Sequence, residues 1–159
     1  MLLTPHTLVG ITIASSISNP FISVPLSFAM HFFGDKVPHW DFFSGVPMGD
    51  RVKGWRIFAV MVDLTLAVAT GLTFTYYALW AKNNSYLAVN IFLSSIASCL
   101  PDALEVPMYY FDSNNFITRS IYAIQHRMQS RADLPWGALS QVVVGLACLL
   151  LLSGSLLQG

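Results

Sequence analysis

Charge is scarce in this chain of 159 residues. Only 10% of the residues are Asp, Glu, Lys or Arg, and eight basic residues balance eight acidic ones to a formal net charge of zero. Proteins that bind nucleic acid through its phosphates carry a basic surface. The sequence has neither an excess of basic residues nor a nucleic-acid-binding motif. We therefore expect no nucleic-acid partner.

Cysteine is also rare. Cys99 and Cys148 both lie in apolar stretches, where a reduced and buried thiol is the simplest expectation, and their spacing is not that of a metal site. The first residues lack the basic region of a secretory signal, so we expect residues 1–18 to remain in the protein.

Apolar residues dominate instead. They make up 55% of the chain, and the mean hydropathy is +0.60, which is typical of membrane proteins. Segments 57–80 and 136–157 are long enough to span the hydrocarbon core. A third segment, 86–100, continues to residue 104 if Pro101 only kinks the helix. With an amphipathic, interfacial helix at 116–129, the sequence predicts a single all-α domain over residues 1–159, an integral membrane helical bundle.

The first 35 residues allow two structures. Thr4 and Pro5 form a helix start, with Thr4 as the cap, and Asn19-Pro20 interrupts the helical pattern. One kinked helix would place His6 more than about 35 Å from His31. A hairpin of two short helices would bring the two histidines together, although each arm is too short to cross comfortably. We favour the hairpin because it gathers the N-terminal ionisable groups.

The basic residues indicate the orientation of the chain in the membrane. They lie mainly before the first long span and between the third span and the last, and they are Lys36, Arg51, Lys53, Arg56, Arg119, Arg127 and Arg131. Basic loops face the cytoplasm, so both of these connections are expected on that side. The resulting prediction is a membrane protein whose two basic connections face the cytoplasm.

Ionisable residues within the apolar chain are the candidate functional groups, because such groups are expensive in a membrane and mark functional sites. The topology predicts that nine of them converge on the cytoplasmic membrane face. They are His6, His31, Asp35, His39, Asp41, Asp63, Asp102, Glu105 and His126. Imidazole and carboxylate groups together suit a divalent metal, with zinc, iron and manganese all compatible.

Structural roles compete with this interpretation. His31 and Asp35 are four residues apart, on one face of a helix, where they also fit a hydrogen-bonded pair that fixes helix packing. Asp63 fits an ion pair with Arg56, seven positions earlier on the same face.

Several short motifs resemble the YdjM-like family of bacterial inner-membrane metal-dependent hydrolases. An opening Thr4-Pro5-His6-Thr7-Leu8-Val9-Gly10 supplies the N-terminal histidine of that family. Its Pro-Asp, His-Arg and His-x-x-x-Asp motifs are matched by Pro101-Asp102, His126-Arg127 and His31-Phe32-Phe33-Gly34-Asp35. The last motif also has a looser similarity to zinc-dependent phospholipases C. The resemblance implies a metal-dependent hydrolase of the bacterial inner membrane, with zinc the first choice of metal.

The chain departs from the family pattern in three places. Its His-x-x-x-Asp motif comes early, the aspartate and histidine that normally follow the Pro-Asp motif are absent, and Ser130-Arg131-Ala132 stands where a Thr-His-Ser is expected. One ligand histidine is therefore missing. Either His39 or Glu105 replaces it, or the site has lost catalytic competence.

The leading hypothesis is a membrane hydrolase that acts at the cytoplasmic interface, with a lipid phosphoester as substrate. The expected ligands are His6, His31, Asp35 and Asp102, with His39, Asp41 and Asp63 as further candidates. The expected catalytic groups are His126 or Glu105 as general base and Arg127 as the holder of an anionic oxygen. The rival is a non-catalytic membrane protein whose polar cluster locks the bundle or lines a proton or metal-ion path. The sequence leaves the oligomeric state open.

Overall fold

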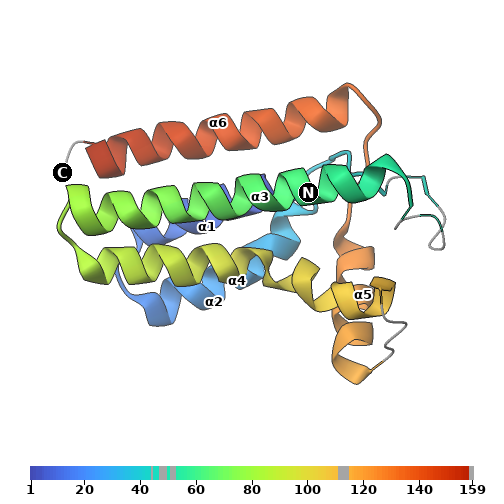
Figure 1. Cartoon of the computed structure of the whole chain (residues 1–159), viewed down its shortest axis with the longest axis horizontal. Helices are drawn as coiled ribbons and strands as arrows, with labels where there is room; N and C mark the ends of the chain where they lie inside the picture. Colours follow the sequence, from blue (N-terminus) through green and yellow to red (C-terminus); the bar gives the residue numbers. More distant parts are fainter. Residues whose placement is uncertain (44, 47–49, 51–52, 111–114, 158–159) are drawn as a thin grey trace.

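The described part of the chain is all-α. In this computed structural model, residues 1–43, 45–46, 50, 53–110 and 115–157 are described, and Arg51, one of the basic residues used to predict the orientation, lies outside them. The helices are α1 (Leu3–Ser16), α2 (Pro20–Gly34), α3 (Trp55–Tyr76), α4 (Ser85–Tyr110), α5 (Phe116–Met128) and α6 (Trp136–Leu157), with the π-helical turn η2 (Tyr77–Ala81) extending α3. Figure 1 shows α1, α3, α4 and α6 running roughly side by side.

Three helical segments are long and apolar enough to cross a membrane, as the sequence predicted. They are Trp55–Ala81, Ser85–Pro107 and Trp136–Ser155. The helix through Pro101 is continuous and passes Pro107 as well, so the third span is longer than its purely apolar part. These spans establish a membrane protein.

The N-terminal residues form the hairpin of two short helices. The chain turns between α1 and α2, where the Asn19 side chain accepts a hydrogen bond from the Phe21 amide and caps α2. The predicted start of α1 is wrong in detail: the helix begins at Leu3, and Thr4 is not its cap. The single kinked helix is excluded.

The short helix α1 lies at the centre of the bundle. It packs against α2, α3, α4 and α6, and Ile11 and Ala14 are fully buried. Close packing is possible because a Cβ atom at Gly10 would come within 2.6 Å of the Ser94 carbonyl oxygen of α4. Small residues that let helix backbones approach are typical of membrane bundles.

Polar contacts join the hairpin to α4 deep in the bundle. Asn90 is fully buried; its amide donates to the carbonyls of Ala14 and Ile17 at 3.1 and 2.9 Å. Its side-chain oxygen accepts from the Ser23 hydroxyl. Asn90 therefore satisfies carbonyls at the end of α1 and fixes the hairpin turn against α4.

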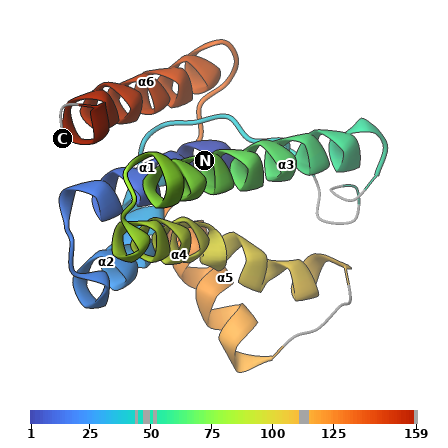
Figure 2. The same ribbon diagram turned by 60° about the vertical axis from the view of Figure 1, so that its left-hand side comes forward.

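The predicted amphipathic helix is present as α5, which projects from the bundle (Figure 2). One face carries the exposed side chains of Phe116 and Ile117, whereas Thr118 and Gln125 are buried. The N-terminus, the loop after α2 and α5 lie toward one end of the molecule, and the turn between η2 and α4 lies at the other (Figure 1).

Replacing Asn90 with alanine should destabilise the protein by roughly 1–2 kcal/mol, because the carbonyls of α1 lose their donors inside the bundle. Thermal unfolding in detergent would measure the effect. Val89→Ala on the exposed face of the same helix is the control, with an expected change within about 0.5 kcal/mol. Equal effects of the two substitutions would contradict the role given to Asn90.

Candidate metal centre

Side chains from three helices meet where the hairpin ends beside α4. His6 comes from the first turns of α1, His31 from the last turn of α2, and Asp35 caps the C-terminus of α2. Asp102 follows Pro101 in α4. Both imidazoles and Asp35 are buried, and the Asp102 side chain is 32% exposed. The hairpin thus brings together residues that are distant in sequence.

Three pairs among these four groups lie within 3.5 Å. His6 Nε2 is 3.2 Å from Asp35 Oδ1, and His31 Nε2 is 3.5 Å from both Asp35 Oδ2 and Asp102 Oδ1. His6, His31 and Asp102 each offer one ligand atom, and these atoms lie within 4.8 Å of one another. The two imidazole rings stack with centroids 3.9 Å apart.

These lengths fit a divalent ion. Bonds of about 2.1 Å from nitrogen or oxygen to tetrahedral zinc place neighbouring ligand atoms about 3.4 Å apart. The contacts of Asp35 with His6 and His31, and of Asp102 with His31, have this length. The ligand atoms of His6, His31 and Asp102 are separated by up to 4.8 Å, so this set would need to contract around an ion. The donor set of imidazoles and carboxylates is one that zinc, iron and manganese share.

The orientation of His31 is fixed from behind. Its Nδ1 donates to the Ser98 carbonyl of α4 at 2.7 Å, which leaves Nε2 facing Asp35 and Asp102. In the neutral imidazole Nε2 accepts a hydrogen bond from the Gln125 amide at 3.0 Å. A backbone carbonyl on the remote nitrogen is the usual support of a metal-ligating histidine.

His39 approaches the same carboxylate from the loop after α2. Its Nδ1 donates to the Val37 carbonyl at 2.8 Å, and its Nε2 lies 3.9 Å from Asp35 Oδ1. Within the described residues this buried Nε2 has no hydrogen-bond partner. Burial lowers the pKa of His39, and the charge of the N-terminal amino group lowers it further. A neutral, fully buried imidazole with an unpartnered nitrogen suits an additional ligand.

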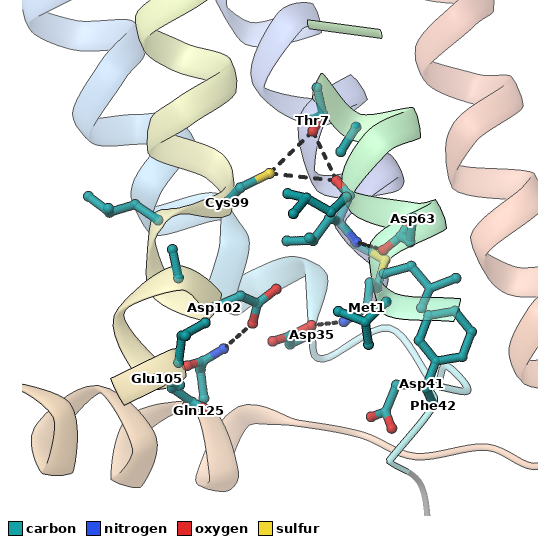
Figure 3. Close-up of a pocket in the computed structure, with 18 of the residues that line it drawn as sticks. Met1, Thr7, Asp35, Asp41, Phe42, Asp63, Cys99, Asp102, Glu105 and Gln125 are labelled. Atoms are coloured by element: carbon teal, nitrogen blue, oxygen red, sulfur yellow. Dashed lines mark hydrogen bonds and ion pairs between the residues drawn. The ribbon is translucent and has the colours of Figure 1, made fainter. Parts of the chain in front are cut away.

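Asp35 is the electrostatic centre of the cluster. Burial alone would raise its pKa, but the hydrogen bond with His6 and the charge of the Met1 amino group hold the pKa well below its ordinary value. Met1 and Asp35 form an ion pair, drawn in Figure 3. The buried carboxylate is therefore ionised and is stabilised by surrounding positive charge.

Asp63 and Asp41 lie outside this cluster. Asp63, on α3, accepts hydrogen bonds from the backbone amides of Leu3 and Thr4 at 2.6 and 3.2 Å and from the Thr4 hydroxyl at 2.7 Å. It thereby caps the N-terminus of α1 from another helix. Asp41 accepts from the Gln129 amide and from the Phe43 backbone.

The three predicted catalytic residues are placed differently from one another. Glu105 is buried one turn after Asp102 and lines a cavity beside the cluster, whereas His126 is exposed at the same cavity and stacks on Tyr122. Arg127 is exposed and does not line the cavity. The residue of α5 that enters the cluster is Gln125, whose amide also donates to Asp102 at 2.7 Å.

Gln125 was not predicted from the sequence, because the neighbouring His126-Arg127 pair matches a family motif and Gln125 does not. A signal was present: Thr118 and Gln125 are seven positions apart, which puts them on one face of a helix. Both are buried. His126 is rotated by about 100° from that face, so its side chain turns away from His31.

The cavity beside the cluster has a volume of about 610 Å³. Figure 3 shows Asp35, Asp102, Glu105 and Gln125 gathered at one part of it and Thr7 and Cys99 further along α1 and α4. The remaining wall is largely apolar and comes from α3 and α4. A polar cluster thus opens onto an apolar pocket of the size usual for small-molecule ligands.

No protein-family model, curated protein or solved structure matches this chain.

Replacing Asp63 with alanine should lower the free energy of unfolding by about 1–2 kcal/mol, because α1 loses its cap. Asp63→Asn should cost less, since one amide oxygen still accepts. Bound metal, measured by mass spectrometry of the purified protein, should equal that of the wild type. Loss of metal from folded Asp63→Ala protein would instead make Asp63 a ligand.

Stability should fall in acid through Asp35. The pKa of Asp35 in the folded protein is below its ordinary value of 3.8, so its stabilising contacts are complete above that value and are lost as the pH falls through the folded pKa. Denaturation midpoints followed from neutral pH into acid should decrease less steeply for Asp35→Asn than for the wild type. Asp133→Asn, at an exposed position, is the control; parallel curves for wild type and Asp35→Asn would contradict the assignment.

Proposed function

We propose that the protein is a membrane-embedded, metal-dependent hydrolase that acts at the cytoplasmic membrane interface on a lipid phosphoester. One observation carries the proposal. His6, His31 and Asp102 each place a ligand atom within 4.8 Å of the others, and Asp35 contacts both imidazoles, beside a cavity with a largely apolar wall. The motifs shared with YdjM-like hydrolases support the same reaction class.

The proposed metal ligands are His6, His31, Asp35 and Asp102, with His39 as an additional donor in place of the missing family histidine. Zinc is the first choice and iron or manganese the alternatives. When bound, such an ion polarises a phosphoryl oxygen and lowers the pKa of a water molecule. Asp41 and Asp63 are left out of the ligand set, because their carboxylates already accept backbone and side-chain hydrogen bonds elsewhere.

Glu105 is the favoured general base among the predicted catalytic groups. It is buried and lines the cavity beside Asp102 and Gln125 (Figure 3), where a carboxylate can accept a proton from water. His126, at the exposed rim of the cavity, is suited to contact a headgroup. Gln125 would hold Asp102 and His31 in position through its amide.

Membrane orientation follows from the basic residues. Lys36 and Lys53 lie before the first span, Arg56 lies in the first turn of that span, and three further arginines lie between α4 and α6. The positive-inside rule supports a cytoplasmic position for these connections and, with them, for the cluster. The resemblance supports a bacterial inner membrane as the location.

The rival function has its own support. The Met1 amino group and the His6 ring already contact the Asp35 carboxylate, and the Gln125 amide contacts that of Asp102, so the network satisfies most of its polar groups without an ion. A structural polar cluster that fixes the helix ends, or a proton or metal-ion path, accounts for these contacts equally.

Metal content separates the two functions. Protein purified in detergent, stripped with a chelator and reloaded with Zn²⁺ should hold about one ion per chain, and His31→Ala and Asp35→Ala should lose it while remaining helical by circular dichroism. His126→Ala is the matched control and should retain the ion. Metal-free wild type that stays folded would support the structural cluster.

Turnover then separates an enzyme from a carrier. With metal bound, hydrolysis of a lipid phosphoester should be abolished by the chelator and by Glu105→Gln. Stoichiometric metal without turnover of phosphoester substrates would favour the metal-ion path.

A further inference from the structure

A groove between α3 and α4 leads away from the polar cluster. It is part of the 610 Å³ cavity and is lined on α3 by Leu64, Ala67, Val68 and Gly71. On α4 it is lined by residues from Phe92 to Ala103. Both helices belong to candidate membrane spans, so the groove lies at membrane depth.

Small residues form its floor. Ala67 and Ser95 are buried at 5% and 8% exposure, and a Cβ atom at Gly71 would lie 3.4 Å from that of Ser95. Larger apolar residues form the rims: Val68 is 52% exposed and Ile96 49%. The groove therefore has small buried residues at its base and larger exposed apolar residues along its sides, and it opens toward the hydrocarbon of the membrane.

Its length matches one leaflet. From Phe92 to Ala103, α4 rises about 17 Å, close to half of a hydrocarbon core of about 30 Å. The end near Ala103 meets Asp102, Glu105 and Gln125. A molecule that fills the whole cavity must have an apolar chain along the groove and a polar group beside the cluster.

We propose that this groove binds one acyl chain of a membrane glycerophospholipid and so holds its phosphate at the cluster. The position of the phosphate rests on the proposed function, because the carboxylates there would repel an anion without a bound cation. The binding of the acyl chain in the groove does not rest on the proposed function, because it depends only on apolar contacts.

Photo-crosslinking tests the binding of the acyl chain in the groove. The full chain is reconstituted in vesicles of phosphatidylethanolamine and phosphatidylglycerol, a fraction of which carries a diazirine at the end of one acyl chain. The labelled residues are then identified by peptide mass spectrometry. Lipid in the groove should label the buried floor around Gly71 and Ser95, whereas lipid around the protein labels exposed residues such as Val62.

Val68→Trp blocks the groove from its rim, and Val62→Trp is the matched control. Both valines are exposed on α3, at 52% and 59%, but Val68 alone lines the cavity. If the indole of Val68→Trp displaces roughly two methylene groups of the acyl chain from the groove, binding weakens and labelling of the floor should decrease about tenfold. The control should label like the wild type.

Three outcomes would overturn the proposal: an unlabelled floor in the wild type, equal labelling of the two tryptophan variants, or stronger floor labelling by a diazirine fatty acid than by the phospholipid. If Val68→Trp fails to fold, Leu64→Trp on the same rim repeats the test.

In the metal-free His31→Ala variant the floor should still be labelled. A labelled floor in a protein without metal or turnover would sustain the groove and refute the hydrolase; turnover with an unlabelled floor would do the reverse.

Discussion

The burial of the Asp35 carboxylate is the constraint on which the rest of this structure depends. A carboxylate at 3% exposure is stable only among compensating donors and charges. His6 comes from α1, His31 from α2 and His39 from the following loop, and all three face it. Because these groups come from separate segments, their contacts with the Asp35 carboxylate hold α1, α2 and the following loop together. His31 also contacts Ser98 and Asp102, which ties α4 to the same cluster.

The short helix α1 depends on polar partners at both of its ends. An α1 of 14 residues is about 21 Å long, less than the hydrocarbon thickness of about 30 Å. Its terminal backbone groups therefore need partners inside the bundle. Asp63 supplies acceptors at one end, and Asn90 supplies donors at the other. Asp63 and Asn90, two polar residues on the spans, thus allow a helix too short to cross the membrane to lie at the centre of the bundle, with His6 near one end.

Much of the fold could be predicted from the sequence because length and hydropathy act locally. The three spans and the amphipathic helix follow from apolar runs, and the hairpin follows from Asn19-Pro20 together with the cost of separating His6 from His31. The cap of α1 could not be predicted, because the capping residue, Asp63, lies about 60 positions away in the sequence. The contact of Gln125 with the cluster could not be read from the His126-Arg127 motif, because a step of one residue rotates a side chain by about 100° on a helix.

The juxtaposition of a buried ionic cluster with an apolar groove favours a site over a purely structural lock. A lock needs only mutual satisfaction of its polar groups, and the bundle would gain from filling the adjacent space with side chains. Instead, Ala67, Gly71 and Ser95 keep a floor low beside carboxylates that repel one another. His39 also keeps a buried nitrogen without a hydrogen-bond partner in the described chain. Unfilled apolar volume and an unpartnered acceptor nitrogen both cost stability; a ligand in the groove would offset the first cost, and a cation at the cluster would offset the second.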